Sequence, residues 1–277
     1  MLTLNKPCEI KDFSDPELIG VMKKLVSPDE SGDADWPRGR EYRKHWEMGM
    51  AVLAMQRHLP ADRRGFALGV GAGTEATSFF LTNIFRWVFA TDLYFTQDWE
   101  MNSPSAMLHA PERFAESIPF KPRRLVTQHM DGRALRYEDE TFDFVYSCGS
   151  IEHFGDRQEI RQAVAEMGRV LKPDGIMAIS TELCVEGGHG YLRPDILLFG
   201  PEEVFELIIA PSGCKPVDVP RFSVSEATLK EKVPFREALA DLQRMHTGSQ
   251  RGWSRYPHIV VQHEKESWTS CQIALRK

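Results

Sequence analysis

Residues 66–92 read FALGVGAGTEATSFFLTNIFRWVFATD, and this stretch decides the fold. Its first part, from Phe66 to Val70, is apolar without polar alternation, which predicts a strand covered on both faces within a parallel sheet. Gly71 and Gly73 follow directly, and glycine permits both a tight turn and a close backbone approach to a ligand. The stretch therefore begins as a strand that leads into a binding loop.

The second half of this stretch predicts a helix over 74–82 and another strand over 86–91. Asp92 then falls at the carboxyl end of that strand. In open α/β sheets a ribose binds at such strand ends, where a carboxylate accepts hydrogen bonds from the ribose hydroxyls. The pattern predicts a site for a nucleoside cofactor.

The identity of that cofactor depends on Glu75. Gly71-x-Gly73-x-x-Ala76 also matches the dinucleotide fingerprint of nicotinamide dehydrogenases. Glu75 is expected in the first turn of the helix, where a diphosphate needs amide groups and the positive end of the helix dipole. A carboxylate there repels a diphosphate but suits a cofactor that carries an ammonium and a sulfonium. A solvated acid at a helix start is the alternative explanation for Glu75.

The composition is that of an ordinary globular protein: 277 residues, 42% hydrophobic and 27% charged. The net charge of −6 argues against nonspecific nucleic-acid binding, which needs a basic surface. The five cysteines include no CxxC pair, so neither a disulfide framework nor a metal site is predicted. With no signal sequence and no run of the ~20 apolar residues that span a bilayer, we expect a cytoplasmic protein without a membrane partner.

The residues before the organising stretch are predicted to be mainly helical. Asp15-Pro16 suits the cap and first position of a helix to about Val26. Residues 27–40 read as a loop, and an i, i+3, i+4 rhythm predicts a second helix over 41–59.

Strands and helices alternate after the organising stretch. Further strands are predicted over 124–129, 141–147, 176–181, 215–219, 258–261 and 270–275, and helices over 201–210 and along the apolar stripe from Ile160 to Leu171. This alternation predicts an α/β fold with a doubly wound, mostly parallel seven-stranded sheet, helices on both faces and a C-terminal antiparallel hairpin.

Four segments, in this order and spacing, resemble motifs of class I S-adenosylmethionine-dependent methyltransferases. They are Ala67–Glu75 (ALGVGAGTE), Asp92, Met130–Asp143 (MDGRALRYEDETFD) and Val145–Phe154 (VYSCGSIEHF), the last followed by an LKPDG turn. The resemblance implies a Rossmann-like methyltransferase domain over 61–277. Residues 1–60 are then expected to be a helical extension or lid, and 222–257 a lid insertion.

The resemblance also implies S-adenosyl-L-methionine as the cofactor and gives roles to single residues. Asp92 is implied to bind the ribose hydroxyls, Asp131 to meet the adenine amino group, and the Gly132 amide to meet a ring nitrogen. The implied cofactor-binding residues are Gly69, Val70, Gly71, Ala72, Gly73, Glu75, Asp92, Leu93, Asp131, Gly132 and Ser147.

The chain departs from the family pattern at two positions. The family usually has an acid where Gly69 stands, and that acid helps to hold the cofactor's ammonium group. The third glycine of the motif is replaced by Glu75. Another carboxylate, such as Glu75 or Glu47, or backbone carbonyls must then hold the ammonium group.

Methyl transfer to a hydroxyl needs alignment, desolvation and a proton acceptor. His153, just past the strand 141–147, is the first candidate base because imidazole titrates near neutrality. Glu152 can orient it, and His189 in the loop after the next strand is the second candidate. Glu182 can bind substrate or a divalent metal, although no ordered cluster of metal ligands stands out.

The acceptor is predicted to be a small molecule or glycan, methylated on oxygen. Ser147-Cys148-Gly149-Ser150 stands where amino-methylating nucleic-acid enzymes of the family carry an Asn/Asp-Pro-Pro-Tyr tetrad. Aromatic residues that suit such an acceptor, or equally a core, are Trp36, Trp46, Tyr94, Trp99, Tyr191 and Trp253. The alternatives are a nicotinamide-dependent oxidoreductase, a non-catalytic scaffold with a methyltransferase-like domain, and an aminopropyl transferase.

Overall fold

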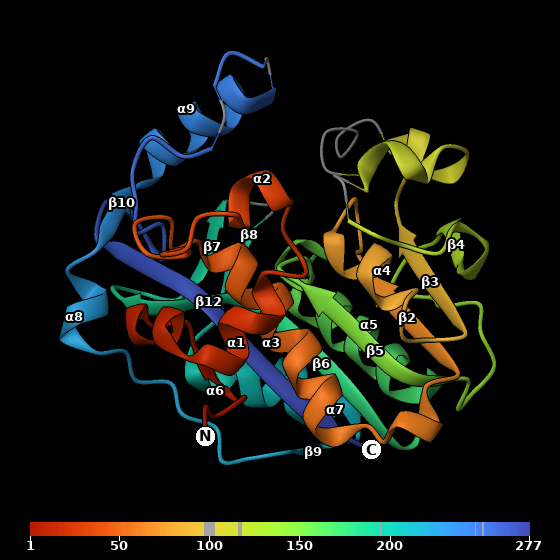
Figure 1. The fold of residues 1–277 in the computed structure, drawn as a ribbon. Coiled ribbons are helices and arrows are strands. Elements are labelled where there is room, and N and C mark those ends of the chain that lie inside the picture. Colours follow the sequence, from red (N-terminus) through yellow and green to blue (C-terminus); the bar gives the residue numbers. More distant parts are fainter. Residues whose placement is uncertain (97–102, 116–117, 194–195, 247, 251) are drawn as a thin grey trace.

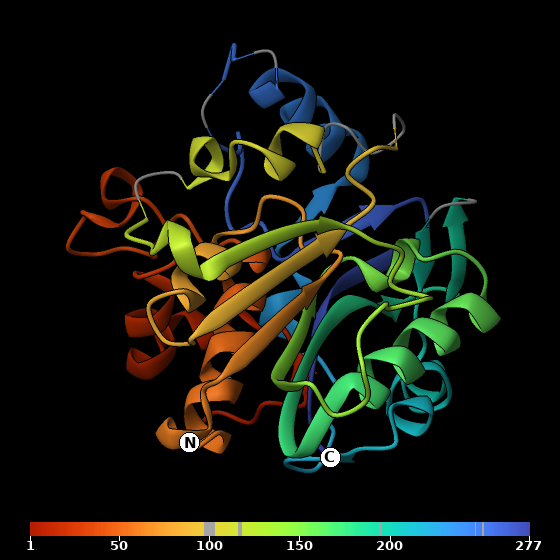
Figure 2. The same cartoon turned by 90° about the vertical axis from the view of Figure 1, so that its right-hand side faces the viewer.

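The computed structural model describes residues 1–277 apart from 97–102, 116–117, 194–195, 247 and 251. A twisted β-sheet runs through the centre of the molecule, and helices lie on both of its faces (Figures 1 and 2). This arrangement confirms the α/β fold predicted from the sequence. Within the described ranges, none of the helices combines the length and hydrophobicity that a membrane span requires.

The sheet has ten strands among the described residues, in the order β10-β11-β12-β6-β5-β2-β3-β4, with β1 and β9 also paired to β12. Its parallel centre consists of β2 (Phe66–Val70), β3 (Trp87–Asp92), β4 (Leu125–His129), β5 (Phe142–Cys148) and β6 (Leu171–Glu186). The antiparallel hairpin is β11 (Val260–His263) and β12 (Glu266–Arg276). These seven strands were predicted, and the strand predicted over 215–219 is present as the short β9 (Lys215–Pro216). Two short strands were not predicted, β1 (Lys6–Pro7) and β10 (Lys232–Pro234).

Strand β6 extends well beyond the predicted 176–181 at both ends. Its carboxyl half is held by β12, with a ladder that runs from Ile176 opposite Arg276 to Glu186 opposite Ser267. The antiparallel partner supplies backbone hydrogen bonds along the carboxyl-terminal extension, which a sequence-local pattern does not reveal. Glu182 therefore lies within the strand and not at its end.

The main helices agree with the sequence to within a few residues. They are α1 (Pro16–Met22), α3 (Arg43–His58), α4 (Ala76–Leu81) and α5 (Arg157–Val170). Helix α9 (Phe235–His246) lies within the expected insertion 222–257, for which no helix bounds were predicted. Asp15 caps α1 as expected, because its carboxylate accepts from the backbone amides of Glu17 and Leu18, both at 3.0 Å.

Several connections contain short elements that the sequence patterns did not predict. The predicted loop 27–40 contains the single-turn helix α2 (Pro28–Ser31), which Ser27 caps through the Glu30 amide. The segment after Pro201 divides into α6 (Pro201–Val204), a π-helical turn (Phe205–Ile209) and α7 (Ala210–Ser212). The other short elements are β7 (Gly190–Arg193), β8 (Ile196–Leu198), α8 (Glu226–Leu229) and 3-10 turns at Ile10–Ser14, Ala61–Arg63, Ser105–Leu108, Pro111–Phe114, Pro122–Arg124 and Ile151–His153.

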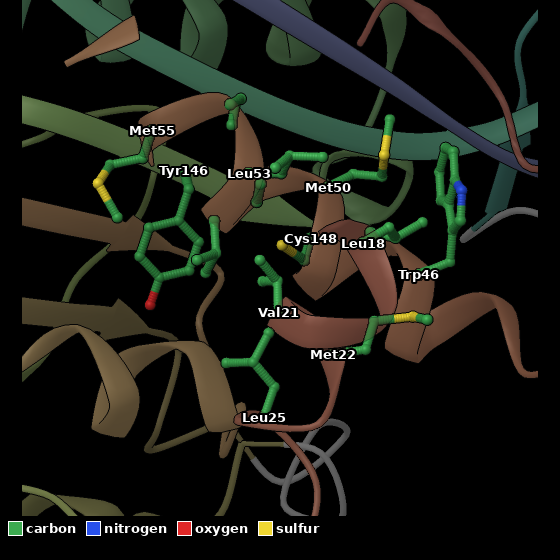
Figure 3. Close-up of a cluster of buried hydrophobic side chains, with 14 of the residues drawn as sticks. Leu18, Val21, Met22, Leu25, Trp46, Met50, Leu53, Met55, Tyr146 and Cys148 are labelled. Atoms are coloured by element: carbon green, nitrogen blue, oxygen red, sulfur yellow. The ribbon is translucent and has the colours of Figure 1, made fainter. Parts of the chain in front are cut away.

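Each face of the sheet carries its own hydrophobic core. Along β5, Phe144 and Tyr146 belong to the core under α1 and α3, whereas Val145 belongs to the core under α5. This alternation follows from the two-residue period of a strand. Figure 3 shows part of the first core, where Leu18 and Met22 of α1, Trp46 and Met50 of α3, and Tyr146 and Cys148 of β5 lie close together.

Residues 1–60 contribute directly to this first core. Strand β1 pairs with β12, and the buried faces of α1 and α3 pack toward the sheet. Trp46 is fully buried, and its indole nitrogen donates to Asp12 at 2.9 Å. The segment that was expected to be an extension or lid thus places helix α3 beside the strands that carry the predicted site.

Candidate active site

The predicted cofactor residues meet at the carboxyl ends of β2, β3 and β4. The carboxylate of Asp92 accepts from the backbone amide of Gly73 at 2.8 Å and from that of Leu93 at 2.6 Å. The backbone carbonyl of Asp92 accepts from the Met130 amide at 2.9 Å, which brings Asp131 alongside. One carboxylate therefore ties the glycine loop to the end of β3. Burial raises the pKa of Asp92, although these amides oppose that shift.

Gly71 allows the loop to turn closely against the segment that follows β5. Its φ is +65°, and a Cβ at this position would lie 2.7 Å from the Cβ of Ser150. The Ser150 hydroxyl donates to the Gly71 carbonyl at 2.7 Å. The Phe154 ring lies just as close, 3.1 Å from that Cβ position and 2.8 Å from the equivalent one at Gly132. The predicted adenine end of the site is therefore lined by an aromatic ring.

Asp131 is engaged by a neighbouring arginine. Its carboxylate accepts from the Arg133 guanidinium at 2.7 and 2.9 Å, and Arg133 also pairs with Glu159. Hydrogen bonding to Arg133 lowers the pKa of Asp131, so the group is a fixed anion at neutral pH. Its contact with an adenine amino group stays a prediction.

Tyr146 explains why position 69 has no acid. A Cβ at Gly69 would lie 2.6 Å from the Tyr146 hydroxyl oxygen and 3.0 Å from the Ala72 Cβ, so no side chain fits there. The hydroxyl is itself 2.6 Å from the hydroxyl of Ser78 at the start of α4. The aromatic side chain of β5 thus fills the space that the family's acid would need.

A cavity of about 360 Å³ opens next to this loop. It is lined by Leu25, Val26, Glu30, Tyr42, Lys44, His45, Glu47, Met48, Thr74, Glu75, Ala76, Phe114, Ile118 and Cys148. Only one lysine faces three glutamates in this lining, and burial lowers the pKa of His45 to about 4, so that its imidazole is neutral. The cavity therefore favours a cationic occupant.

Glu75 differs from the position predicted for it. It is the N-cap residue of α4, with extended backbone angles, and its side chain makes no capping hydrogen bond. Its Oε2 atom is buried and has no hydrogen-bond partner among the described residues. Burial raises the pKa of Glu75 well above its ordinary value, and the negative charge of Glu47 adds to the shift. An orphaned buried carboxylate of this kind fits a positively charged group of the cofactor.

A buried ionic cluster joins α3 to strands β6 and β12. Arg43 donates to Glu182 at 2.5 and 2.7 Å and to the Ser270 hydroxyl at 3.0 Å, while Lys44 lies 3.0 Å from Glu47. Burial opposes ionisation of Glu182, but Arg43 and Lys44 outweigh it and lower its pKa. Glu182 is therefore committed to this cluster.

Sequence reasoning missed Arg43 and Lys44. A local signal existed, because Arg43 and Glu47 stand at i, i+4 spacing on one helix. Their main partner, Glu182, lies 139 residues away, and no spacing rule connects the two.

Glu152 and His153 lie together in the 3-10 turn after β5. Glu152 is buried and accepts from the Thr181 hydroxyl at 3.0 Å, and its other oxygen lies 4.0 Å from the His153 Nε2. Burial raises the pKa of Glu152, and His153 opposes that shift. Glu152 is placed to stabilise a charged imidazolium at His153 without a direct hydrogen bond in this state.

His189 lies in a different place from these two residues. Its Nδ1 is 2.8 Å from Glu203, which Arg157 also contacts. It lines a second cavity of about 420 Å³ together with Tyr191, His263 and the 264–266 turn. Neither Glu152 nor His153 lines this second cavity, and the carboxylate that contacts His189 is Glu203 and not Glu152.

The remaining predicted residues are mostly buried at the strand ends. Val70 and Ala72 are buried, and the Ser147 hydroxyl is buried with no hydrogen-bond partner among the described residues. Tyr94 is fully buried, and its hydroxyl donates to the Gly73 carbonyl at 2.9 Å. Its ring therefore supports the glycine loop and is not available to stack on a ligand. Trp99 lies outside the described residues.

Comparison with known proteins agrees with this geometry. Residues 68–179 match the family model described as a methyltransferase domain. A human protein described as probable tRNA methyltransferase 9B is 34% identical over 68 residues, which make up 24% of this chain and 15% of that protein. This chain therefore spans only a small part of that relative.

Two solved structures show the shared fold. The [4+2]-cyclase SpnF has a TM-score of 0.54 and 17% identity, over 98% of this chain and 97% of that chain. Phosphoethanolamine N-methyltransferase 2 from Haemonchus contortus, solved with S-adenosyl-L-methionine, has a TM-score of 0.50 and 18% identity, over 83% of this chain and 52% of that chain. Residues 68–179 are therefore similar to a methyltransferase domain, and the chain has the fold that class I S-adenosylmethionine-dependent methyltransferases share.

Proposed function

We propose that this protein transfers a methyl group from S-adenosylmethionine to a hydroxyl oxygen of a small molecule or glycan. The observation that carries the proposal is the cavity of about 360 Å³ that lies against the glycine loop, with Glu75 in its wall, whose Oε2 has no hydrogen-bond partner among the described residues. The acids of this wall would repel a diphosphate, whereas an ammonium or sulfonium group stabilises the ionised form of Glu75.

The residues around the loop fit the different parts of this cofactor. Asp92 retains acceptor capacity for ribose hydroxyls beyond its two amide contacts, because an ionised carboxylate offers about four lone-pair sites. Phe154 offers an aromatic face beside Gly132 at the adenine end. Glu75 and Glu47 provide negative charge at the other end. When bound, the cofactor supplies a methyl group that its sulfonium already activates.

His153 is the proposed general base. It takes the proton of the acceptor hydroxyl, and the buried carboxylate of Glu152 at 4.0 Å stabilises the imidazolium that forms. Its side chain is 26% exposed, so a proton can reach solvent afterwards. The protein otherwise contributes alignment and exclusion of water, which are the main needs of a displacement at an activated carbon.

The fold itself does not require methyl transfer, since the SpnF neighbour is described as a cyclase. The human relative is described as a probable tRNA methyltransferase. A tRNA acceptor needs a basic surface, and the net charge of −6 speaks for a smaller acceptor. The family match over 68–179 favours methyl transfer over a cyclase or a scaffold.

Ligand titration tests the first part of this proposal. Calorimetry of the full chain with S-adenosylhomocysteine, NADH and NAD⁺ is expected to show binding of S-adenosylhomocysteine alone. Binding of the nicotinamide cofactors alone would contradict the proposal, and no binding of any of them at millimolar concentrations would favour a scaffold. Transfer of a labelled methyl group to a panel of small hydroxylated acceptors, but not to bulk tRNA, then tests the acceptor class.

A further inference from the structure

We propose that Glu75, and not a residue at position 69, holds the amino group of the cofactor's methionine part, and that Glu75 releases a proton when it does so. The inference rests on the proposed function and assigns its ammonium site. It begins from the space at Gly69, which Tyr146 fills: the hydroxyl oxygen would lie 2.6 Å from any Cβ there. The acidic side chain that the family usually has at position 69 therefore does not fit in this chain.

Glu75 is the carboxylate in this cavity that can bind the ammonium group instead. Its backbone is extended at the N-cap of α4, and the side chain does not cap the helix but lines the cavity. Glu47, the other buried acid of that wall, already has partners: Lys44 at 3.0 Å, Arg43 at 3.6 Å and the hydroxyls of Ser180 and Ser270. Among the described residues, Glu75 Oε2 has none.

The groups that face Glu75 come from every neighbouring element. Helix α3 brings Lys44 and Glu47, strand β3 brings Asp92, and the 3-10 turn after β5 brings Glu152. The uncharged acids Tyr94, Tyr146 and Cys148 also face it. Lys44 is the one cation in this set, and it is shared between Glu47 at 3.0 Å and Glu182 at 3.7 Å.

These surroundings favour the neutral form of Glu75 in the free protein, because its charged form would be buried among other negative charges. An incoming ammonium group reverses that preference. The Glu75 O–H bond breaks, its proton goes to solvent, and the carboxylate that remains accepts hydrogen bonds from the ammonium group. Atoms and charge balance without any further reactant.

The test compares two ligands that differ at this end only. S-adenosylhomocysteine carries the amino acid, and 5′-methylthioadenosine lacks it. Calorimetry of wild-type protein at neutral pH, in two buffers of different ionisation enthalpy, is expected to show net proton release for S-adenosylhomocysteine and none for methylthioadenosine.

Glu75→Gln is expected to abolish that proton release and to weaken S-adenosylhomocysteine binding by about 10- to 100-fold, since a charged hydrogen bond is lost. Methylthioadenosine binding is expected to stay within about 2-fold of wild type, which also shows that the variant is folded. Glu206→Gln, at an exposed position after Pro201, is the charge-matched control and is expected to behave as wild type.

Three results would overturn the inference. The first is that wild-type protein takes up protons, or exchanges none, when S-adenosylhomocysteine binds. The second is that Glu75→Gln and wild type bind S-adenosylhomocysteine with equal affinity. The third is that the variant loses affinity for S-adenosylhomocysteine and methylthioadenosine equally. None of these results contradicts the proposed function as long as wild-type protein binds S-adenosylhomocysteine. If wild-type protein binds neither nucleoside, the proposed function fails together with the inference.

Discussion

The two proposed sides of the site are built in different ways. The cofactor side consists of the glycine loop and Asp92, and the acceptor side consists of His153 and the buried ionic cluster around Glu182. On the cofactor side, Asp92 meets Gly73, which lies 19 residues away in the same strand–turn–helix–strand unit. On the acceptor side, Arg43 of α3 meets Glu182 of β6, 139 residues away, and Ser270 of β12, 227 residues away. The first side is held by backbone amides within one unit, and the second by buried charges from three distant segments.

Because of this difference, substitutions on the two sides are expected to affect different quantities: cofactor binding, turnover or stability. A change at Asp92 is expected to act on the loop and on cofactor binding, because the carboxylate contacts the loop and is the proposed ribose acceptor. A change at Arg43 is expected to act on the fold, because it leaves two buried carboxylates with Lys44 as their shared counter-charge. His153 lies beside the acceptor-side cluster, so its removal is expected to change turnover and leave the cofactor side intact.

His153→Ala is expected to have the largest effect and to sharpen this separation. Turnover falls by about 10²- to 10⁴-fold if the imidazole is the general base, whereas S-adenosylhomocysteine affinity stays near wild type. Steady-state kinetics and calorimetry on the same preparations measure the two quantities. His189→Ala is the matched control, since His189 contacts Glu203 and not Glu152. If His189→Ala loses turnover and His153→Ala keeps it, the base has been assigned to the wrong residue.

Arg43→Met is expected to lower the free energy of unfolding by about 3–5 kcal/mol, because Glu182 loses its nearest cation and two buried carboxylates are left to share Lys44. The Arg63–Asp174 pair at 3.3 Å is the control, since both side chains are at least one-third exposed. Arg63→Met is expected to cost about 0–1 kcal/mol. Urea unfolding monitored by circular dichroism measures both variants. Equal effects would show that the buried cluster has no special role in stability.

Asp92→Ala is expected to weaken S-adenosylhomocysteine binding by about 1–3 kcal/mol, since the ribose loses a charged acceptor and the Gly73 amide loses its partner. Calorimetry measures the affinity, and Asp139→Ala, a change at an exposed acid, controls for net charge. Unchanged affinity in Asp92→Ala would remove the ribose role and with it the proposed difference between the two sides.

In the ligand-free protein, Glu75→Gln is expected to have the smallest of these effects, a change in how thermal stability depends on pH. Burial raises the folded-state pKa of Glu75 above its ordinary value of 4.5. An acid of this kind disfavours the folded state as pH rises through and above that ordinary value, because only the unfolded chain then loses the proton freely. The melting temperature of Glu75→Gln is therefore expected to match wild type near pH 4.5 and to exceed it increasingly toward neutral pH. A constant offset at all pH values would contradict this account.

The sequence predicted the cofactor side well and the acceptor side poorly, for the same physical reason. The glycine loop, β3 and Asp92 lie within 27 consecutive residues, so hydrophobic runs and glycine positions were enough to predict how they meet. The ionic cluster depends on α3 lying across β6 and β12, which no local pattern encodes. The extension of β6 through Glu186 was missed for the same reason, since β12 supports it.

Single residues show the limit of motif reasoning as well. The missing acid at Gly69 was visible in the sequence, but its cause, the Tyr146 side chain 77 positions later, was not. Glu75 was expected in the first helical turn and is instead the N-cap, and that shift leaves its carboxylate in the cavity and not on the helix. A difference of two residues in the helix start, from the predicted 74 to Ala76, thus changes the chemical role that is available.

A structure determined with S-adenosylhomocysteine bound tests the central claim most directly. The ribose hydroxyls are expected within hydrogen-bond distance of the Asp92 carboxylate, and the amino group within hydrogen-bond distance of Glu75, in the cavity against the glycine loop. A ligand with its amino group away from Glu75 and its ribose away from Asp92 would contradict the claim that these two carboxylates hold the cofactor between them.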